Sequence, residues 1–186
     1  MTEKADAITV RTIMEQFVKD EGVKARLQMI RDRNTNDWEK WLQVELQYFI
    51  SKLPKVHVER EIRATPDKRM LRNRKSMSVD LVLSKSRKVE KSYIFIELKC
   101  TRDVQPLING FNQDIEKINS IRLCNYNLQS AWYVGFHLNC SKLSIEKIKN
   151  HLSYYPHSYH DVIRLCKCID DDECQCKNKS IGLAIL

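Results

Sequence analysis

The sequence has no run of apolar residues that approaches the 18 or more needed to span a membrane, so we expect no membrane partner. Its first residues, MTEKADAITV, lack the basic and then apolar stretch of a secretory signal. We therefore expect a cytoplasmic protein. Its seven cysteines are an odd number, which favours reduced thiols or metal ligands over a disulfide framework.

The chain also lacks internal repeats and low-complexity linkers, so its 186 residues are expected to form one domain with a substantial core. Hydrophobic residues make up 42% and charged residues 30%, a balance typical of globular proteins. The net charge of +8 permits a polyanionic partner but does not require one, because basic surfaces also keep proteins soluble.

Hydrophobic periodicity predicts an α/β domain with a helical N-terminal region. The helices are expected at 9–20 (ended by Gly22), 23–30, 36–53, 109–123 and 141–152, the last capped by Ser141. The strands are expected at 55–65, 78–84, 93–100, 131–138, 161–168 and 180–186. The first three strands should form an antiparallel meander, because their connections contain no crossover helix.

Two opposite charges interrupt the apolar stretch YIFIELKC. Alternate strand residues point to opposite faces, so Glu97 and Lys99 share one face, about 7 Å apart. The preceding strand carries a single acid, Asp80, within the apolar run SVDLVLS. If the two strands are neighbours, Asp80 and Glu97 can converge on one divalent cation with Lys99 beside it.

The helix predicted over 36–53 adds a fourth candidate. Glu45 lies near the centre of its wide apolar arc, and a carboxylate on a buried face is costly unless it is paired or coordinated. Glu39 has a simpler explanation, because it follows Asn36 at the spacing of a capping box.

Two acids and a lysine suit metal-assisted hydrolysis of a phosphodiester, in which hard oxygen ligands hold Mg²⁺ and the lysine steadies negative charge. The tripeptide Glu-x-Lys alone carries no weight, since about one is expected by chance in such a composition. In the alternative interpretation, Asp80 and Glu97 are exposed on a one-sided sheet and Glu45 pairs with a neighbouring lysine or arginine.

The order helix Glu, strand Asp and, seventeen positions later, strand Glu-x-Lys resembles the PD-(D/E)xK nuclease superfamily over about residues 36–138. The resemblance implies a restriction-endonuclease-like core, a central mixed β-sheet flanked by helices. It implies a single nuclease domain over 1–186, with a helical region at 1–35, a catalytic core at 36–138 and a C-terminal helix and hairpin at 139–186.

The same resemblance implies Mg²⁺ as the cofactor and Lys99 as a catalytic residue. The implied metal ligands are Asp80, Glu97, the backbone carbonyl of Leu98 and, directly or through water, Glu45. The family's proline before the aspartate is Val79 here. We interpret the literal Pro66-Asp67, which lies in a basic stretch, as a chance match.

Two basic stretches flank the expected site strands. Their members, interpreted as contacts to the phosphates of double-stranded DNA, are Lys68, Arg69, Arg72, Arg74, Lys75, Lys85, Arg87 and Lys88. The alternative is that these residues belong to ordinary solvated loops.

No part of the sequence resembles a helix-turn-helix or a zinc-finger array, so sequence recognition is expected from a partner. Size and composition are similar to the small catalytic subunits of heterodimeric type IIS restriction endonucleases. That resemblance implies an endodeoxyribonuclease that cuts one strand while a larger nicking subunit recognises the site. The alternatives are a stand-alone homodimeric nuclease of the same fold, such as a junction resolvase or a phage or defence nuclease, and a non-catalytic DNA-binding module.

The C-terminal cysteines Cys166, Cys168, Cys174 and Cys176 form two C-x-C pairs around an acidic turn. Four thiolates on two hairpin arms can build a tetrahedral structural zinc site. The same spacing fits a packed hairpin, so both interpretations stay open.

Overall fold

The structure is a computed structural model that describes residues 2–35, 37–70, 76–85, 92–166, 168 and 180–186, without the side chains of Thr2 and Lys85. Its helices are α1 (Thr2–Lys19), α2 (Glu21–Asp32), α3 (Glu39–Ser51), α4 (Val104–Asn119) and α5 (Lys142–Leu152). Its strands are β1 (Val56–Pro66), β2 (Met77–Lys85), β3 (Ser92–Thr101), β4 (Ile121–Cys124), β5 (Asn127–His137), β6 (Tyr159–Arg164) and β7 (Ser180–Ile185). No helix of this described part is both long and apolar enough to cross a membrane.

One seven-stranded mixed sheet forms the centre of the molecule, in the order β4-β1-β2-β3-β5-β7-β6. The expected meander is confirmed, since β1 pairs antiparallel with β2 and β2 with β3. The pair β3–β5 is parallel, and α4 lies in the connection between these two strands. In the strand order, β3 and β5 have neighbours on both sides and helices on both faces. This central position explains why Ile94–Leu98 form a fully buried run.

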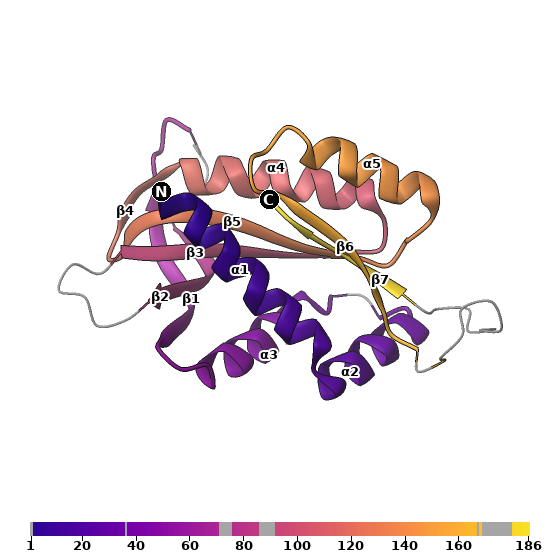
Figure 1. Cartoon of the computed structure of the whole chain (residues 1–186). Coiled ribbons are helices and arrows are strands. Elements are labelled where there is room, and N and C mark those ends of the chain that lie inside the picture. The colour runs from indigo at the N-terminus through magenta and orange to yellow at the C-terminus, as the bar shows by residue number, and fades with distance from the viewer. Residues whose placement is uncertain (1, 36, 71–75, 86–91, 167, 169–179) are drawn as a thin grey trace.

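Helices cover both faces of the sheet (Figure 1). On one face, α1, α2 and α3 pack in a core that includes Phe17, Leu46 and Leu98. On the other face, α4 and α5 pack in a second core that includes Phe95 and Phe111. The alternation of β3 thus sends Phe95 to the α4 face and Leu98 to the α3 face, as a strand period of two requires.

Several element boundaries differ from the sequence predictions. The first helix begins at Thr2 rather than near residue 9 and ends at Lys19, close to the expected residue 20. Gly22 does not end it but lies inside α2, which Asp20 caps by accepting the backbone N–H of Val23. The helix predicted to reach residue 123 ends at Asn119, where the chain forms the short edge strand β4. The Ser141 cap of α5 is confirmed, since its hydroxyl accepts the N–H of Ser144.

Two histidines join β5 to β6 across β7. The His137 Nδ1 lies 2.8 Å from the Asn139 carbonyl, which can only accept, so Nδ1 carries the proton. The unprotonated His137 Nε2 lies 3.0 Å from the His160 Nε2, which donates to it. Protonation of His137 at Nε2 would break this bond. Burial lowers the pKa of both rings, that of His160 to about 4.

We expect protonation of this histidine pair to lower the stability of the protein in acid. Both folded-state pKa values lie below the ordinary 6.5. The neutral pair therefore makes its full contribution to the free energy of unfolding above pH 6.5, and this contribution is lost as the pH falls towards 4. Because His160 is only half-buried and solvent screens its charge, the loss should be about 1–2 kcal/mol. Urea unfolding at pH 7.5 and 5 measures it.

The control is His160→Gln, whose amide can still donate to His137 but does not titrate. The wild-type protein should lose more unfolding free energy than this variant between pH 7.5 and 5, while exposed His57→Gln should behave as wild type. Equal losses in wild type and His160→Gln would contradict the prediction.

Candidate active site

The site begins where β2 and β3 part. The antiparallel pairing of β2 with β3 ends at Leu81, which lies opposite Ile96. The next residues in register are Asp80 and Glu97. Here the Asp80 carboxylate replaces the backbone ladder, because its Oδ2 accepts the Leu98 N–H at 2.8 Å. Its Oδ1 accepts the amide of buried Gln43 at 2.8 Å, which ties β2 to α3. Asp80 is thus held between the two strands and the helix above them.

Glu97 is the most deeply buried acid of this region, at 2% exposure. Its Oε2 accepts from the Lys117 ammonium of α4 at 2.5 Å, while its Oε1 is buried with no hydrogen-bond partner among the described residues. Burial and the nearby charge of Asp80 raise the pKa of Glu97 to about 8. The ionised carboxylate is therefore electrostatically unfavourable as it stands.

Lys99 lies between the two helix layers. Its Nζ is 3.3 Å from Oδ2 of Asp114 on α4 and 3.8 Å from Oε2 of Glu39 on α3. The aliphatic chain of Lys99 crosses Gly110, where an added Cβ would lie 2.9 Å from Cγ and Cδ of the lysine. Gly110 and Asp114, one helical turn apart, thus leave room for Lys99 and anchor its ammonium.

We call Glu39, Asp80, Glu97, Lys99, Asp114 and Lys117 the acid–lysine cluster. Its four carboxylates exceed its two ammonium groups, which gives a formal charge of −2 when all are ionised. Burial raises the pKa of both Glu39 and Asp114 and outweighs the opposing charge of Lys99, while the charge of Asp80 adds a smaller upward contribution. Although burial lowers the pKa of Lys99, the attraction of Asp114 and Glu39 outweighs it and the net shift is upward. The cluster has an excess of negative charge that a divalent cation would neutralise.

No protein-family model, curated protein or solved structure matches this chain. The geometry of the acid–lysine cluster is therefore the guide to its function.

The sequence predicted a site of three acids and one lysine. The structure brings together Asp80, Glu97 and Lys99 but not Glu45. Glu45 forms an ion pair with Arg26 of α2, as the alternative interpretation of this residue proposed. The helix residues that face the site are Glu39 and Gln43, one turn apart, and Glu45 points about 200° away from Gln43 on the helix wheel. Glu39 accepts the Cys100 N–H at 3.3 Å. The assignment of Glu39 to a capping box was wrong, because α3 begins at Glu39 with Trp38 as its N-cap.

The α3 assignment failed because this helix is apolar on nearly every side. Val44 and Tyr48 belong to the wide apolar arc predicted from the sequence, yet they are 51% and 59% exposed. The buried residues of α3 are Leu42, Gln43, Leu46 and Ile50. Gln43, flanked by leucines on the buried face, was the available signal.

The cluster offers few but suitable donors to a cation. In the part of the chain that the structure describes, no three or more His, Cys, Asp or Glu side chains are arranged to hold a metal. What Asp80 and Glu97 offer is a carboxylate each, including the unpartnered Oε1. The N–H of Leu98 points towards β2, since it donates to Asp80. In an extended residue the carbonyl points the same way as the N–H, so the Leu98 carbonyl also faces this edge of β3, beyond the last β2–β3 pair. Such hard oxygen donors fit Mg²⁺.

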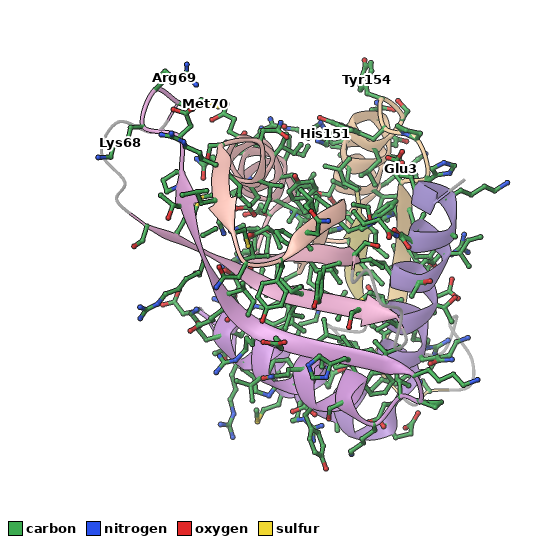
Figure 2. All side chains as sticks on the ribbon, turned by 90° about the vertical axis from the view of Figure 1, so that its left-hand side faces the viewer. Glu3, Lys68, Arg69, Met70, His151 and Tyr154 are labelled. Atoms are coloured by element: carbon green, nitrogen blue, oxygen red, sulfur yellow. The ribbon has the colours of Figure 1, made fainter. Side chains whose placement is uncertain are left out.

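The two basic stretches lie at opposite ends of the β2 strand. Residues 67–76 precede β2, in which Asp80 is the fourth residue, about 10 Å from the strand's start, whereas Lys85 ends β2 about 17 Å from Asp80 along the strand. Lys68 and Arg69 are exposed together and point away from the sheet (Figure 2). Arg69 binds Asp67, whose pKa it lowers to about 2, so Asp67 does not belong to the cluster. The remaining expected phosphate contacts, Arg72, Arg74, Lys75, Arg87 and Lys88, lie outside the described residues.

A polar pocket of about 390 Å³ adjoins the cluster at the end of β3. Its walls include Thr35, Cys100, Thr101 and Arg102. Cys100 connects the pocket to the cluster through its bond to Glu39. None of the six cluster residues lines this pocket, whose described walls carry one acid, Asp37, and one base, Arg102.

Only two of the four expected zinc ligands lie within the described residues. Cys166 is partly buried and Cys168 is exposed, while Cys174 and Cys176 lie outside the described residues.

Proposed function

We propose that the chain is a Mg²⁺-dependent endodeoxyribonuclease with a restriction-endonuclease-like core. The observation that carries the proposal is Glu97, a buried acid with one unpartnered oxygen beside Asp80 and Lys99. A protein gains no stability from such an arrangement, and acids with strongly raised pKa values are typical of functional sites. A divalent cation would use the free oxygen and offset the excess charge.

The residues of the cluster divide the work of phosphodiester hydrolysis. Asp80 and Glu97, with the Leu98 carbonyl, would hold the cation, which supplies polarisation of the phosphate and activation of water. Lys99 would steady the negative charge that develops on the phosphate. Glu39 and Asp114 would position Lys99, since both lie against its ammonium. Asp80 is itself oriented by Gln43 and the Leu98 N–H.

We also propose that a larger subunit supplies sequence recognition, as in heterodimeric type IIS restriction endonucleases. All five helices of the described residues pack on the single sheet, so none of them forms a separate base-reading module. One acid–lysine cluster cuts one strand, and a duplex cut therefore needs a second site. The exposed Lys68 and Arg69 would add affinity for DNA phosphates without sequence information.

A non-catalytic module of the same fold is the second candidate. It is favoured by the ion pairs Lys117–Glu97 and Lys99–Asp114, which partly neutralise the cluster without any cation. A requirement for Mg²⁺ separates the two candidates.

The proposal is tested on supercoiled plasmid, with Mg²⁺ or EDTA, using the purified chain alone and mixed with lysate of the source cells. We expect discrete fragments only when the chain, the lysate and Mg²⁺ are all present. Nicking by the chain alone would support a stand-alone nuclease, and a symmetric dimer in gel filtration would agree with it. Intact plasmid throughout, together with Mg²⁺-independent DNA binding, would favour the non-catalytic module.

A further inference from the structure

Lys117 is a second lysine in contact with the proposed cation site. Its ammonium binds Glu97, one of the two carboxylates proposed to hold the cation. It belongs to the last turn of α4 and reaches Glu97 across the helix–sheet interface. Its side chain is 16% exposed, so the ammonium is nearly removed from water. Lys99 differs, because its ion-pair partners are Glu39 and Asp114.

The geometry points to Lys117 as a built-in counter-ion of Glu97 that a divalent cation must displace in order to bind. The inference rests on the proposed function of the same site. An ammonium 2.5 Å from one carboxylate oxygen and a divalent cation on the other oxygen would lie within a few ångströms of each other. At that separation, and with little water between them, like charges repel strongly. The two cations therefore compete for Glu97.

Two further observations agree with displacement. The Glu97 Oε1 has no hydrogen-bond partner among the described residues, so a cation that binds it displaces no protein donor from that oxygen. Lys117 stands at the C-terminal end of α4, where the helix dipole favours a positive charge, so the released ammonium retains a favourable location. Lys117 would therefore keep the metal-free protein paired and make cation binding weaker than two carboxylates alone would allow.

The test is the dissociation constant for Mn²⁺, measured by electron paramagnetic resonance at pH 8 without DNA. Lys117→Met should bind Mn²⁺ at least about tenfold more tightly than wild type, because a competing charge is removed. Lys99→Met is the matched control, with the same change of charge at a lysine held by other carboxylates. Its affinity should rise by a smaller factor.

A second variant guards against loss of folding. Lys117→Gln keeps an N–H donor for Glu97 without the charge, and it should show the same tightening. Equal gains for the Lys117 and Lys99 variants would indicate a general charge effect and overturn the inference. So would Mn²⁺ binding to wild type that neither Lys117 variant alters. If wild type and all variants fail to bind Mn²⁺, the proposed function fails as well, which distinguishes the two failures.

Discussion

Replacing Glu97 with glutamine should lower Mg²⁺-dependent cleavage by about 10³-fold or more. Glutamine has almost the same shape but binds Mg²⁺ far more weakly, because its oxygen carries no full charge. The readouts are the plasmid assay with the partner present and the Mn²⁺ dissociation constant of the chain alone. Cleavage by purified Glu97→Gln at more than one tenth of the wild-type rate would contradict the assignment.

The same variant should remain folded without metal. The amide oxygen introduced by the substitution can still accept from Lys117, and the cost of burying a charge beside Asp80 disappears. We expect its unfolding free energy in EDTA at pH 7 to be no lower than that of wild type. Because the folded-state pKa of Glu97 is raised to about 8, wild type loses stability as the pH rises from 4.5 through 8. Glu97→Gln should not show this part of the loss.

Glu45→Gln is the matched control for Glu97→Gln. It makes the same chemical change on an acid that forms a partly exposed ion pair with Arg26. Cleavage should stay within about twofold of wild type, and stability should fall by no more than about 1 kcal/mol.

Replacing Gly135 with alanine should destabilise the protein by about 3 kcal/mol, at the upper end of the overpacking range. Gly135 lies in β5 opposite Lys99, directly beneath α4. A Cβ there would lie 2.4 Å from the Leu107 side chain and 2.6 Å from the Phe111 ring, both fully buried. The helix would have to move away from the sheet, and it carries Asp114 and Lys117. Urea unfolding measures the cost.

Gly22→Ala is the control for this change. Gly22 lies in α2, where the nearest atom to an added Cβ is 3.2 Å away and belongs to the Asp20 side chain. Alanine also favours a helix over glycine, so we expect a change of less than about 1 kcal/mol. Similar losses for Gly22→Ala and Gly135→Ala would show that close packing under α4 is not the cause.

The strand part of the site could be predicted from sequence because strands have a strict period of two. Single charges in apolar runs therefore identified Asp80, Glu97 and Lys99 as neighbours on two adjacent strands. The antiparallel order of these strands followed from their short connections.

The helix part of the site could not be predicted with the same certainty. In α3 the apolar residues extend around the helix, so periodicity does not determine which acid faces the sheet, and Glu45 was chosen in place of Glu39. In α4 a signal was present but unused. Asp114 lies on the same helical face as buried Phe111 and Ile118, and Lys117 is three residues further on. Periodicity indicates which face of this helix is buried, but not that this face packs against β3.

The different bonding of Asp80 and Glu97 bears on how the chain could change by descent. Asp80 contributes to the fold whether or not a cation binds, since it satisfies the Leu98 N–H and the Gln43 amide. Glu97 and Lys117 form a buried pair that well-packed apolar residues could replace without loss of stability. A descendant released from catalysis would therefore be expected to lose Glu97 and Lys117 together and to retain Asp80. If the cluster has the proposed function, the buried glutamate would be a better mark of an active site in such a descendant than the aspartate.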